Sequence, residues 1–224
     1  TVSTPNFMYN QLVEKKNGTW QYTPLKYWPN NDSDKISFFA YAPHNATGVT
    51  PSNAIQKGYP SFTYTTPTAE ADQVDLLAAT PIINQNGGSV DFKMQHALTK
   101  VVFNVKSNDD ITGKVITAFS ITGAKSGTLA FHVPANDDDK GFGWTYPSTV
   151  TAETFTATTK SLSVPDKSTP EEAILCTYFL LPTNIGNTFN ITYTYIGIKG
   201  TQTVTLTNQP LPSLDKWLSG AFVS

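Results

Sequence analysis

VDFKMQHALTKVVFNVKS, residues 90 to 107, decides the fold, because apolar and polar residues alternate along it in two different phases. Every second residue from Val90 to Leu98 falls on one face of an extended strand, whereas the apolar residues from Val101 to Val105 follow the opposite phase. A one-residue shift reverses every side chain, so the change of phase requires a β-bulge, or a strand that leaves one sheet and joins another. We therefore predict a sheet corner around Thr99 and Lys100.

His96 lies beside this corner, on the face predicted to point inward, and it allows two interpretations. In the first, its ring nitrogens bind backbone groups where the chain bends. In the second, the imidazole is a general base or a metal ligand. No second His, Cys or carboxylate stands nearby at a spacing typical of metal ligands. We predict a structural role for His96 and Lys100, and no catalytic residue, cofactor or metal ion.

The composition favours strands over helices throughout the chain. The 224 residues include 33 Thr, 13 Phe and 10 Tyr, which suit a pleated and half-buried surface. The 15 Pro and 14 Gly interrupt the chain too often for long helices. Asn17-Gly18, between two strand-like arms, is the strongest short signal of a β-hairpin because both turn residues need a positive φ. We predict an all-β protein.

A break in composition at NQNGGS, residues 84 to 89, divides the chain into two predicted domains, residues 1–86 and 87–224. The second domain has short strands at the spacing of a Greek-key β-sandwich. ILCTYFLL, residues 174 to 181, is apolar on both faces and should be a central strand, whereas FNITYTYIG, residues 189 to 197, should expose one face. The predicted strands are Val90–Lys106, Val115–Ile121, Leu129–Val133, Phe155–Val164, Ile174–Leu181, Phe189–Ile196 and Thr203–Thr207.

Charge and motifs argue against nucleic-acid binding and against catalysis. The net charge is −2, Arg is absent, and no block of Lys could follow a phosphate backbone. The sequence has no G-x-S-x-G, no phosphate-binding G-x-x-x-x-G-K and no H-E-x-x-H motif. Cys176 lies in an apolar run and is predicted to be buried and inert. A carboxylate pair for glycoside cleavage is left open, with none favoured among Glu14, Glu70, Glu153, Glu171 and Glu172.

Two acidic stretches and one aromatic stretch raise the question of a ligand. NNDSDK, residues 30 to 35, and NDDDKG, residues 136 to 141, offer oxygens but lack the Gly and the distant Glu of an EF-hand loop, and solvated turns explain both. Trp144 and Tyr146 lie in the Gly-rich stretch KGFGWTYP, residues 140 to 147. Most aromatic residues are expected to form the core, and a loop at this stretch is the better candidate for contact between aromatic rings and a ligand such as a sugar.

Several stretches together resemble the fimbrillin-like proteins of Bacteroides and its relatives. The resemblance covers the chain from about residue 7, and each stretch alone is a weak signal. It is carried by DLLAAT (residues 75 to 80) ahead of the stretch at 90 to 107, by GTWQYTPLKYWPNNDSDKISFFAYAP (18 to 43), by TYFLLPTN (177 to 184) with FNITYTY (189 to 195), and by KWLSGAFVS (216 to 224).

The resemblance implies a two-domain pilin made of transthyretin-like Greek-key β-sandwiches. Such proteins are exported as lipoproteins and form stalk, anchor or tip subunits of fimbriae on the extracellular face of the outer membrane. A protease removes a leading strand, and the groove then accepts a strand of the next subunit. The expected partners are therefore other pilus subunits, the lipid anchor would lie upstream of Thr1, and the N-terminal domain, residues 1–86, would lack its first strand or strands.

Two departures from the family pattern shape these expectations. Processing in the family typically follows an Arg, and this sequence has none, so cleavage would lie before Thr1 or not take place. The sequence also ends four residues after Gly220, which suggests a tip subunit that accepts a strand and offers none, with a glycan or protein ligand. The alternative is a cell-surface carbohydrate-binding protein that is not part of a pilus.

Overall fold

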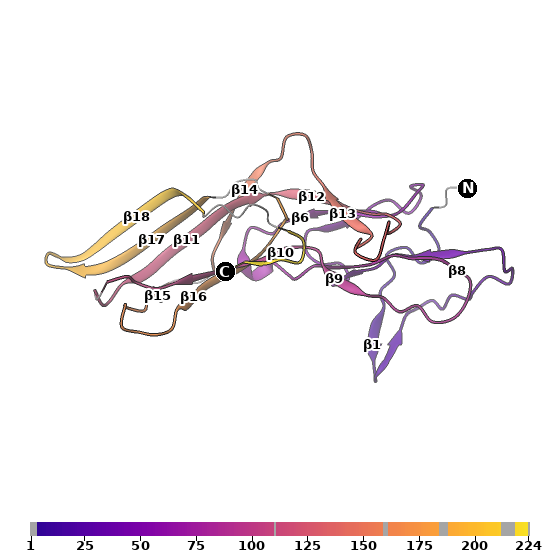
Figure 1. Cartoon of the computed structure of the whole chain (residues 1–224), viewed down its shortest axis with the longest axis horizontal. Coiled ribbons are helices and arrows are strands. Elements are labelled where there is room, and N and C mark those ends of the chain that lie inside the picture. The colour runs from indigo at the N-terminus through magenta and orange to yellow at the C-terminus, as the bar shows by residue number, and fades with distance from the viewer. Residues whose placement is uncertain (1–3, 110, 159–160, 184–187, 212–217, 224) are drawn as a thin grey trace. The chain divides into compact units, whose positions relative to one another are not determined.

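The computed structural model describes residues 4–109, 111–158, 161–183, 188–211 and 218–223. These residues form an all-β structure whose one helical element is the short 3-10 turn η1, Glu70–Asp72 (Figure 1). The prediction of an all-β protein is confirmed. The described residues contain no helix that is long and apolar enough to cross a membrane.

The chain forms two compact units, and each is assembled from three separate stretches. Unit 1 comprises Thr1–Tyr64, Leu76–Gln95 and Gly127–Thr145, and unit 2 comprises Thr65–Asp75, His96–Ser126 and Tyr146–Ser224. The division predicted at residues 86 and 87 falls within the second stretch of unit 1. A single boundary could not describe these units, because the chain passes from one unit to the other several times.

Unit 1 contains four small sheets with an aromatic core. The ring of Phe62 packs against Tyr41, Phe131 and Trp144. Asn17 and Gly18 have φ of 51° and 81° between paired strands, so the predicted hairpin is confirmed. The sheets are β13-β12-β6-β5 (Phe142–Thr145, Ser126–Phe131, Ser61–Thr65, Val49–Pro51), β4-β7-β9 (Tyr41–Ala42, Leu77–Ala79, Met94–His96), β3-β8 (Ile36–Phe38, Ile82–Gln85) and β1-β2 (Glu14–Lys16, Thr19–Gln21).

Unit 2 consists of two sheets that share one core, an arrangement consistent with a β-sandwich. Phe103 of the smaller sheet and Phe119 of the larger one pack with ring centroids 4.8 Å apart. Figure 1 shows the long strands β11, β17 and β18 side by side. The larger sheet has the order β14-β11-β17-β18 (Ala152–Thr156, Val115–Ala124, Thr188–Gly197, Gly200–Pro210), with β15 (Leu162–Ser163) also on β11, and the smaller sheet has the order β16-β10-β19 (Ala173–Leu180, Thr99–Val105, Phe222–Val223).

The strand predictions in this region were mostly right, with three exceptions. The predicted strand Phe155–Val164 covers two separate strands, the end of β14 and the short β15. The predicted strand at Leu129–Val133 overlaps β12, which belongs mainly to unit 1. The run ILCTYFLL forms β16, which lies at the edge of its sheet and not at the centre. Side chains from Thr65–Asp75 accept hydrogen bonds from the outer edge of β16, which explains how an edge strand can have the apolar pattern of a central one. The predicted half-exposed strand at 189 to 197 is β17, whose Phe189, Ile191 and Tyr193 pack on the core.

The stretch from residue 90 to 107 leaves one sheet and joins another, which is one of the two predicted explanations of its change of phase. Its first part ends in β9, its second part is β10, and the buried Ala97 and Leu98 lie between them. The predicted inward face before the corner is wrong, since Phe92, Met94 and His96 are exposed. These side chains are exposed because β9 is only three residues long and lies at the edge of its sheet, with a paired strand on one side.

Candidate functional site

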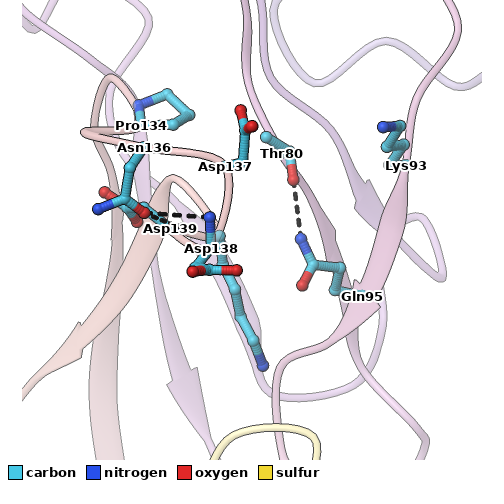
Figure 2. Close-up of a pocket in the computed structure, with 9 residues that line it drawn as sticks. Thr80, Lys93, Gln95, Pro134, Asn136, Asp137, Asp138 and Asp139 are labelled. Atoms are coloured by element: carbon cyan, nitrogen blue, oxygen red, sulfur yellow. Dashed lines mark hydrogen bonds between the residues drawn. The ribbon is translucent and has the colours of Figure 1, made fainter.

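An open hollow in unit 1 lies between the loop at residues 134 to 140 and the segments that carry Thr80, Lys93 and Gln95 (Figure 2). The acidic loop faces Thr80 and Gln95 across the hollow. The Gln95 amide nitrogen donates a hydrogen bond of 2.8 Å to the Thr80 hydroxyl, and the Thr80 backbone N–H donates to the carbonyl of Lys93. The hollow has a volume of about 610 Å³, and its lining is mainly polar and charged.

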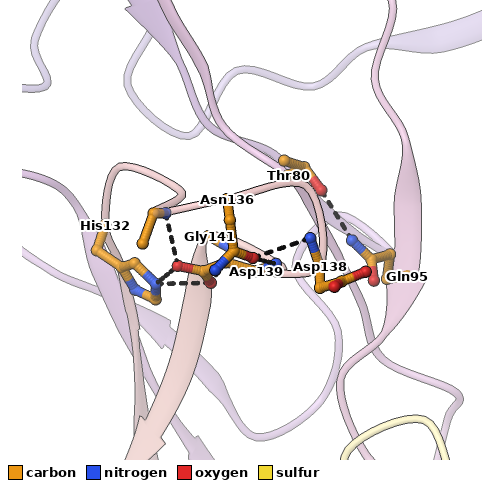
Figure 3. Close-up of polar contacts among 8 residues, drawn as sticks. Thr80, Gln95, His132, Asn136, Asp138, Asp139 and Gly141 are labelled. Carbon is orange, nitrogen blue, oxygen red and sulfur yellow. Dashed lines mark hydrogen bonds and ion pairs between the residues drawn. The ribbon is translucent and has the colours of Figure 1, made fainter.

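The acidic loop is held by its own side chains (Figure 3). The Asn136 side-chain oxygen accepts hydrogen bonds from the backbone N–H groups of Asp138 and Asp139, at 3.0 and 3.1 Å. The Asp139 carboxylate accepts backbone N–H bonds from Ala135 and Gly141 and lies 2.9 Å from His132 Nε2. Because these donors stabilise the carboxylate, mainly the two backbone N–H groups, they lower the pKa of Asp139 to about 2.

This loop arrangement gives little support to a metal centre. The oxygens that a cation would use, those of Asn136 and Asp139, already accept bonds that shape the turn. Within the described ranges, no group of three or more His, Cys, Asp or Glu side chains could hold a metal ion. The other acidic stretch behaves similarly, because the Asn31 side-chain oxygen accepts bonds from the backbone and hydroxyl of Ser33. Both stretches therefore form turns with local Asn-centred hydrogen bonds.

Trp144 and Tyr146 do not share an exposed loop. Trp144 lies on β13 and is half-buried, with its ring 6.1 Å from that of Phe62 and 6.3 Å from that of Tyr64. The Tyr146 hydroxyl donates to the carbonyl of Pro182 over 3.1 Å, and burial raises the pKa of this hydroxyl. The predicted loop position of Trp144 is thus wrong, and ligand contact by these two residues stays a prediction.

Two aromatic residues of unit 1, Trp20 and Tyr27, are far more exposed than the sequence reasoning predicted. Trp20 is 67% exposed and Tyr27 is 79% exposed, although most aromatic residues of this region were predicted to be core. Trp20 lies on β2 of the hairpin, and its two neighbours on that strand, Thr19 and Gln21, are both polar. The polar neighbours of Trp20 are the signal that could have placed it on the surface.

His96 and Lys100 lie at the corner, but His96 does not point inward as predicted. Its side chain is 61% exposed, and Nδ1 lies 2.8 Å from the Asp75 carboxylate. The Lys100 backbone N–H donates to the carbonyl of Ala221 over 3.0 Å, and its ammonium lies 5.6 Å from the centre of the Phe222 ring. Lys100 therefore helps to hold β19 beside β10.

One margin of unit 2, formed by the edges of β14 and β16, has partners from Thr65–Asp75. We call it the closed margin. Thr156 of β14 donates its backbone N–H to the carbonyl of Thr68. Thr177 and Phe179 of β16 donate theirs to the side chains of Glu70 and Gln73. Backbone groups on both edges are therefore hydrogen-bonded.

The opposite margin of unit 2 is paired much less. We call it the open margin, and it consists of the outer edge of β18 and the edge of β10 beyond Val101. Among the described residues, β10 pairs with β16 along Thr99–Val105 and with β19 at Lys100 and Val101, and β18 pairs only with β17. Leu206 of β18 faces the core side, opposite Ile191, and is still 40% exposed. Backbone and apolar surface are therefore accessible together here.

Comparison with known proteins identifies relatives that form fimbriae. A family model described as fimbrillin-like matches residues 1–221. Fimbrium subunit Fim1C of Phocaeicola vulgatus is 36% identical over 138 residues, which are 55% of this chain and 36% of that protein, so the match spans well under two thirds of the relative. A crystal structure of a fimbrial protein from Bacteroides vulgatus is similar with a TM-score of 0.70 and 25% identity, over 94% of this chain and 77% of that one.

Proposed function

Because the chain belongs to the fimbrillin-like family, we propose that it is a structural or adhesive subunit of cell-surface fimbriae that joins its neighbours by β-strand exchange along the open margin of unit 2. The matched fimbrial relatives support the fimbrial role. The observation that carries the strand-exchange step is the outer edge of β18, which pairs only with β17 among the described strands and lies beside the exposed apolar side chain of Leu206.

An added strand would find both requirements for β-augmentation at this margin. A strand added beside β10 after Val101 would supply main-chain partners from Phe103 to Val105, and these bonds would provide affinity. Alternate side chains of the added strand would then point toward Val204 and Leu206 on the inner face of β18, and burial of that apolar surface would fix the register.

The cellular setting follows from the same proposal. Assembly would take place on the extracellular face of the outer membrane, with a lipid anchor upstream of Thr1 where the subunit carries one. The transthyretin-like Greek-key description of both domains is part of this proposal, and the two-sheet core of unit 2 supports it.

A pair of charge substitutions on one strand tests the proposal. Leu206→Lys places an ammonium on the inner face of β18, where the added strand would lie, whereas Thr203→Lys places the same charge on the exposed outer face of the same strand. We expect Leu206→Lys to reduce polymer formation, seen as fimbriae by electron microscopy and as high-mass species in native gels. Thr203→Lys should assemble normally. Normal assembly of folded Leu206→Lys would refute exchange at this margin.

A carbohydrate-binding protein outside a pilus is the second candidate, and exposed Trp20 and Tyr27 favour it. Aromatic faces of this kind can stack on sugar rings, because the apolar face of a pyranose packs well on a π-system. A glycan array with the parent chain and a Trp20→Ala/Tyr27→Ala variant would test this function. Binding that depends on both rings, from a chain that forms no polymers, would favour this second candidate.

A further inference from the structure

We propose that Glu70 and Gln73 form an edge guard that blocks the closed margin of unit 2 against strand addition. The blocking itself is a property of unit 2 alone. Its consequence, that intermolecular strand exchange is restricted to the open margin, rests on the proposed function above.

The guard occupies two consecutive outward-facing donors of β16. The Thr177 backbone N–H donates to Glu70 Oε1 over 2.7 Å, and the Phe179 backbone N–H donates to Gln73 Oε1 over 2.8 Å. Residues two apart in a strand direct their N–H groups to the same side, which here is the side away from β10. A strand arriving at this edge would need these same two N–H groups.

Glu70 also reaches the other sheet of unit 2. Its second oxygen, Oε2, accepts a hydrogen bond of 2.8 Å from the backbone N–H of Thr158, which follows β14. One carboxylate therefore accepts from backbone donors next to both sheet edges, and charge-assisted bonds of this type are among the stronger ones. The N–H of Thr156 is occupied as well, by the carbonyl of Thr68.

The guard residues are themselves held in place. The Gln73 backbone N–H donates to the carbonyl of Glu70 and closes the turn η1. The Gln73 side-chain nitrogen donates to the carbonyl of Pro67 over 2.9 Å, and the side chain is almost fully buried. The acceptor oxygen of Gln73 is thus oriented toward β16 before any partner strand approaches.

The sequence of β16 explains why this edge needs protection. Ala173–Leu180 reads AILCTYFL, with no charged residue and no Pro, and these are the residues that usually discourage edge-to-edge pairing. High β-propensity, strong hydrophobicity and low charge are also the features of aggregation-prone segments. Because the side chains of Glu70 and Gln73 accept hydrogen bonds from its outward N–H groups, β16 can have an apolar sequence without presenting an unpaired edge.

The test compares a double variant, Glu70→Ala/Gln73→Ala, with Asp72→Ala. Asp72 lies in the same turn and is exposed, and its carboxylate accepts none of the hydrogen bonds found among the described residues, so it is a matched control. We expect hydrogen exchange at the Thr177 and Phe179 amides to become about five to ten times faster in the double variant, as for one lost hydrogen bond per amide. Sedimentation should show concentration-dependent self-association where the Asp72→Ala chain stays monomeric.

A third substitution locates the association. Thr177→Lys, added to the double variant, places a charge on the edge strand and should restore the monomer. A double variant that is folded, exchanges faster and remains monomeric would overturn the guard, because Glu70 and Gln73 would then be ordinary stabilising partners. If the double variant does not fold, Gln73→Ala alone frees the Phe179 donor, and a monomeric Gln73→Ala chain would also overturn the proposal.

The two proposals fail separately. Self-association through β16 should persist when Leu206→Lys is added to the double variant, because that charge lies on the opposite margin. Loss of association on adding Leu206→Lys would assign it to the open margin and refute the guard. Normal fimbria formation by Leu206→Lys alone would refute strand exchange at the open margin and leave the blocking of β16 intact.

Discussion

The Tyr178 hydroxyl donates a hydrogen bond of 3.2 Å to the carbonyl oxygen of Phe155 and so connects β16 to β14 through the core of unit 2. Both residues are fully buried. Tyr64 in unit 1 is equally buried, but its hydroxyl has no hydrogen-bond partner among the described residues. Burial raises the pKa of both hydroxyls, so both stay protonated at neutral pH.

Replacing these two tyrosines by Phe should have opposite effects. Tyr178→Phe should lower the free energy of unfolding by about 1 kcal/mol, because it removes a satisfied bond and leaves the Phe155 carbonyl with one partner fewer. Tyr64→Phe should raise the free energy of unfolding by about 1 kcal/mol, because it removes a hydroxyl that was desolvated without compensation. Urea denaturation followed by fluorescence would measure both. A stabilised Tyr178→Phe variant, or a destabilised Tyr64→Phe variant, would contradict this account.

Gly141 should not tolerate a side chain. Its φ is +72°, and a Cβ atom there would lie 2.4 Å from Pro81 Cδ and 2.9 Å from Pro134 Cγ. Gly141→Ala should therefore lower the free energy of unfolding by about 2–4 kcal/mol, from the left-handed backbone and the clash together.

Gly143 provides the control for that substitution. It lies two residues further along the chain, on β13; its φ is not positive, and a Cβ atom there would have no neighbour within 4 Å. Gly143→Ala should change the free energy of unfolding by less than about 1 kcal/mol. If urea denaturation showed equal losses of unfolding free energy in Gly141→Ala and Gly143→Ala, the close approach of the two prolines would not constrain residue 141.

Local patterns predicted local structure well in this chain. Asn17-Gly18 predicted its hairpin because the positive φ values depend only on those two residues. The change of phase in the stretch from residue 90 to 107 predicted a change of sheet because the alternation of apolar residues likewise depends only on residues close together in the sequence. The two-unit arrangement could not be predicted, because β12 pairs with β6 across about sixty residues of sequence, and no local pattern encodes that pairing.

The functional residues were harder to predict than the strands. Glu70 was only one of five glutamates in the sequence with no distinguishing motif, and its role follows from contacts with Thr158 and Thr177, 88 and 107 residues away. β16 looked like a central strand because periodicity reports which faces are apolar and not whether an edge is paired. His96 looked buried because its phase was read from neighbours that themselves proved exposed.

Cys176 should be unreactive in the folded protein. Its thiol is buried in the unit 2 core, and desolvation, with a further contribution from the Glu70 charge, raises the pKa of the thiol to about 12. We expect no reaction with a thiol-specific chromogenic reagent at pH 8 under native conditions and one equivalent after unfolding in urea. Rapid reaction of the native protein would show that β16 opens readily, and would place Cys176 outside the stable core.

The Asp139 carboxylate should make stability depend on pH in the acid range. Its pKa is about 2 in the folded chain against an ordinary value of 3.8, so the folded state binds this proton less tightly than the unfolded state. The stabilisation is therefore fully present above about pH 4 and is lost as the pH falls toward 2.

The difference in Tm between the parent chain and Asp139→Asn should be constant from pH 5 to 7 and shrink below pH 4. Asp138→Asn is the matched control, since it removes a carboxylate of the same loop that accepts no described hydrogen bond. A Tm difference for Asp139→Asn that stays constant down to pH 2 would mean that the bonds from Ala135, Gly141 and His132 do not favour the charged carboxylate.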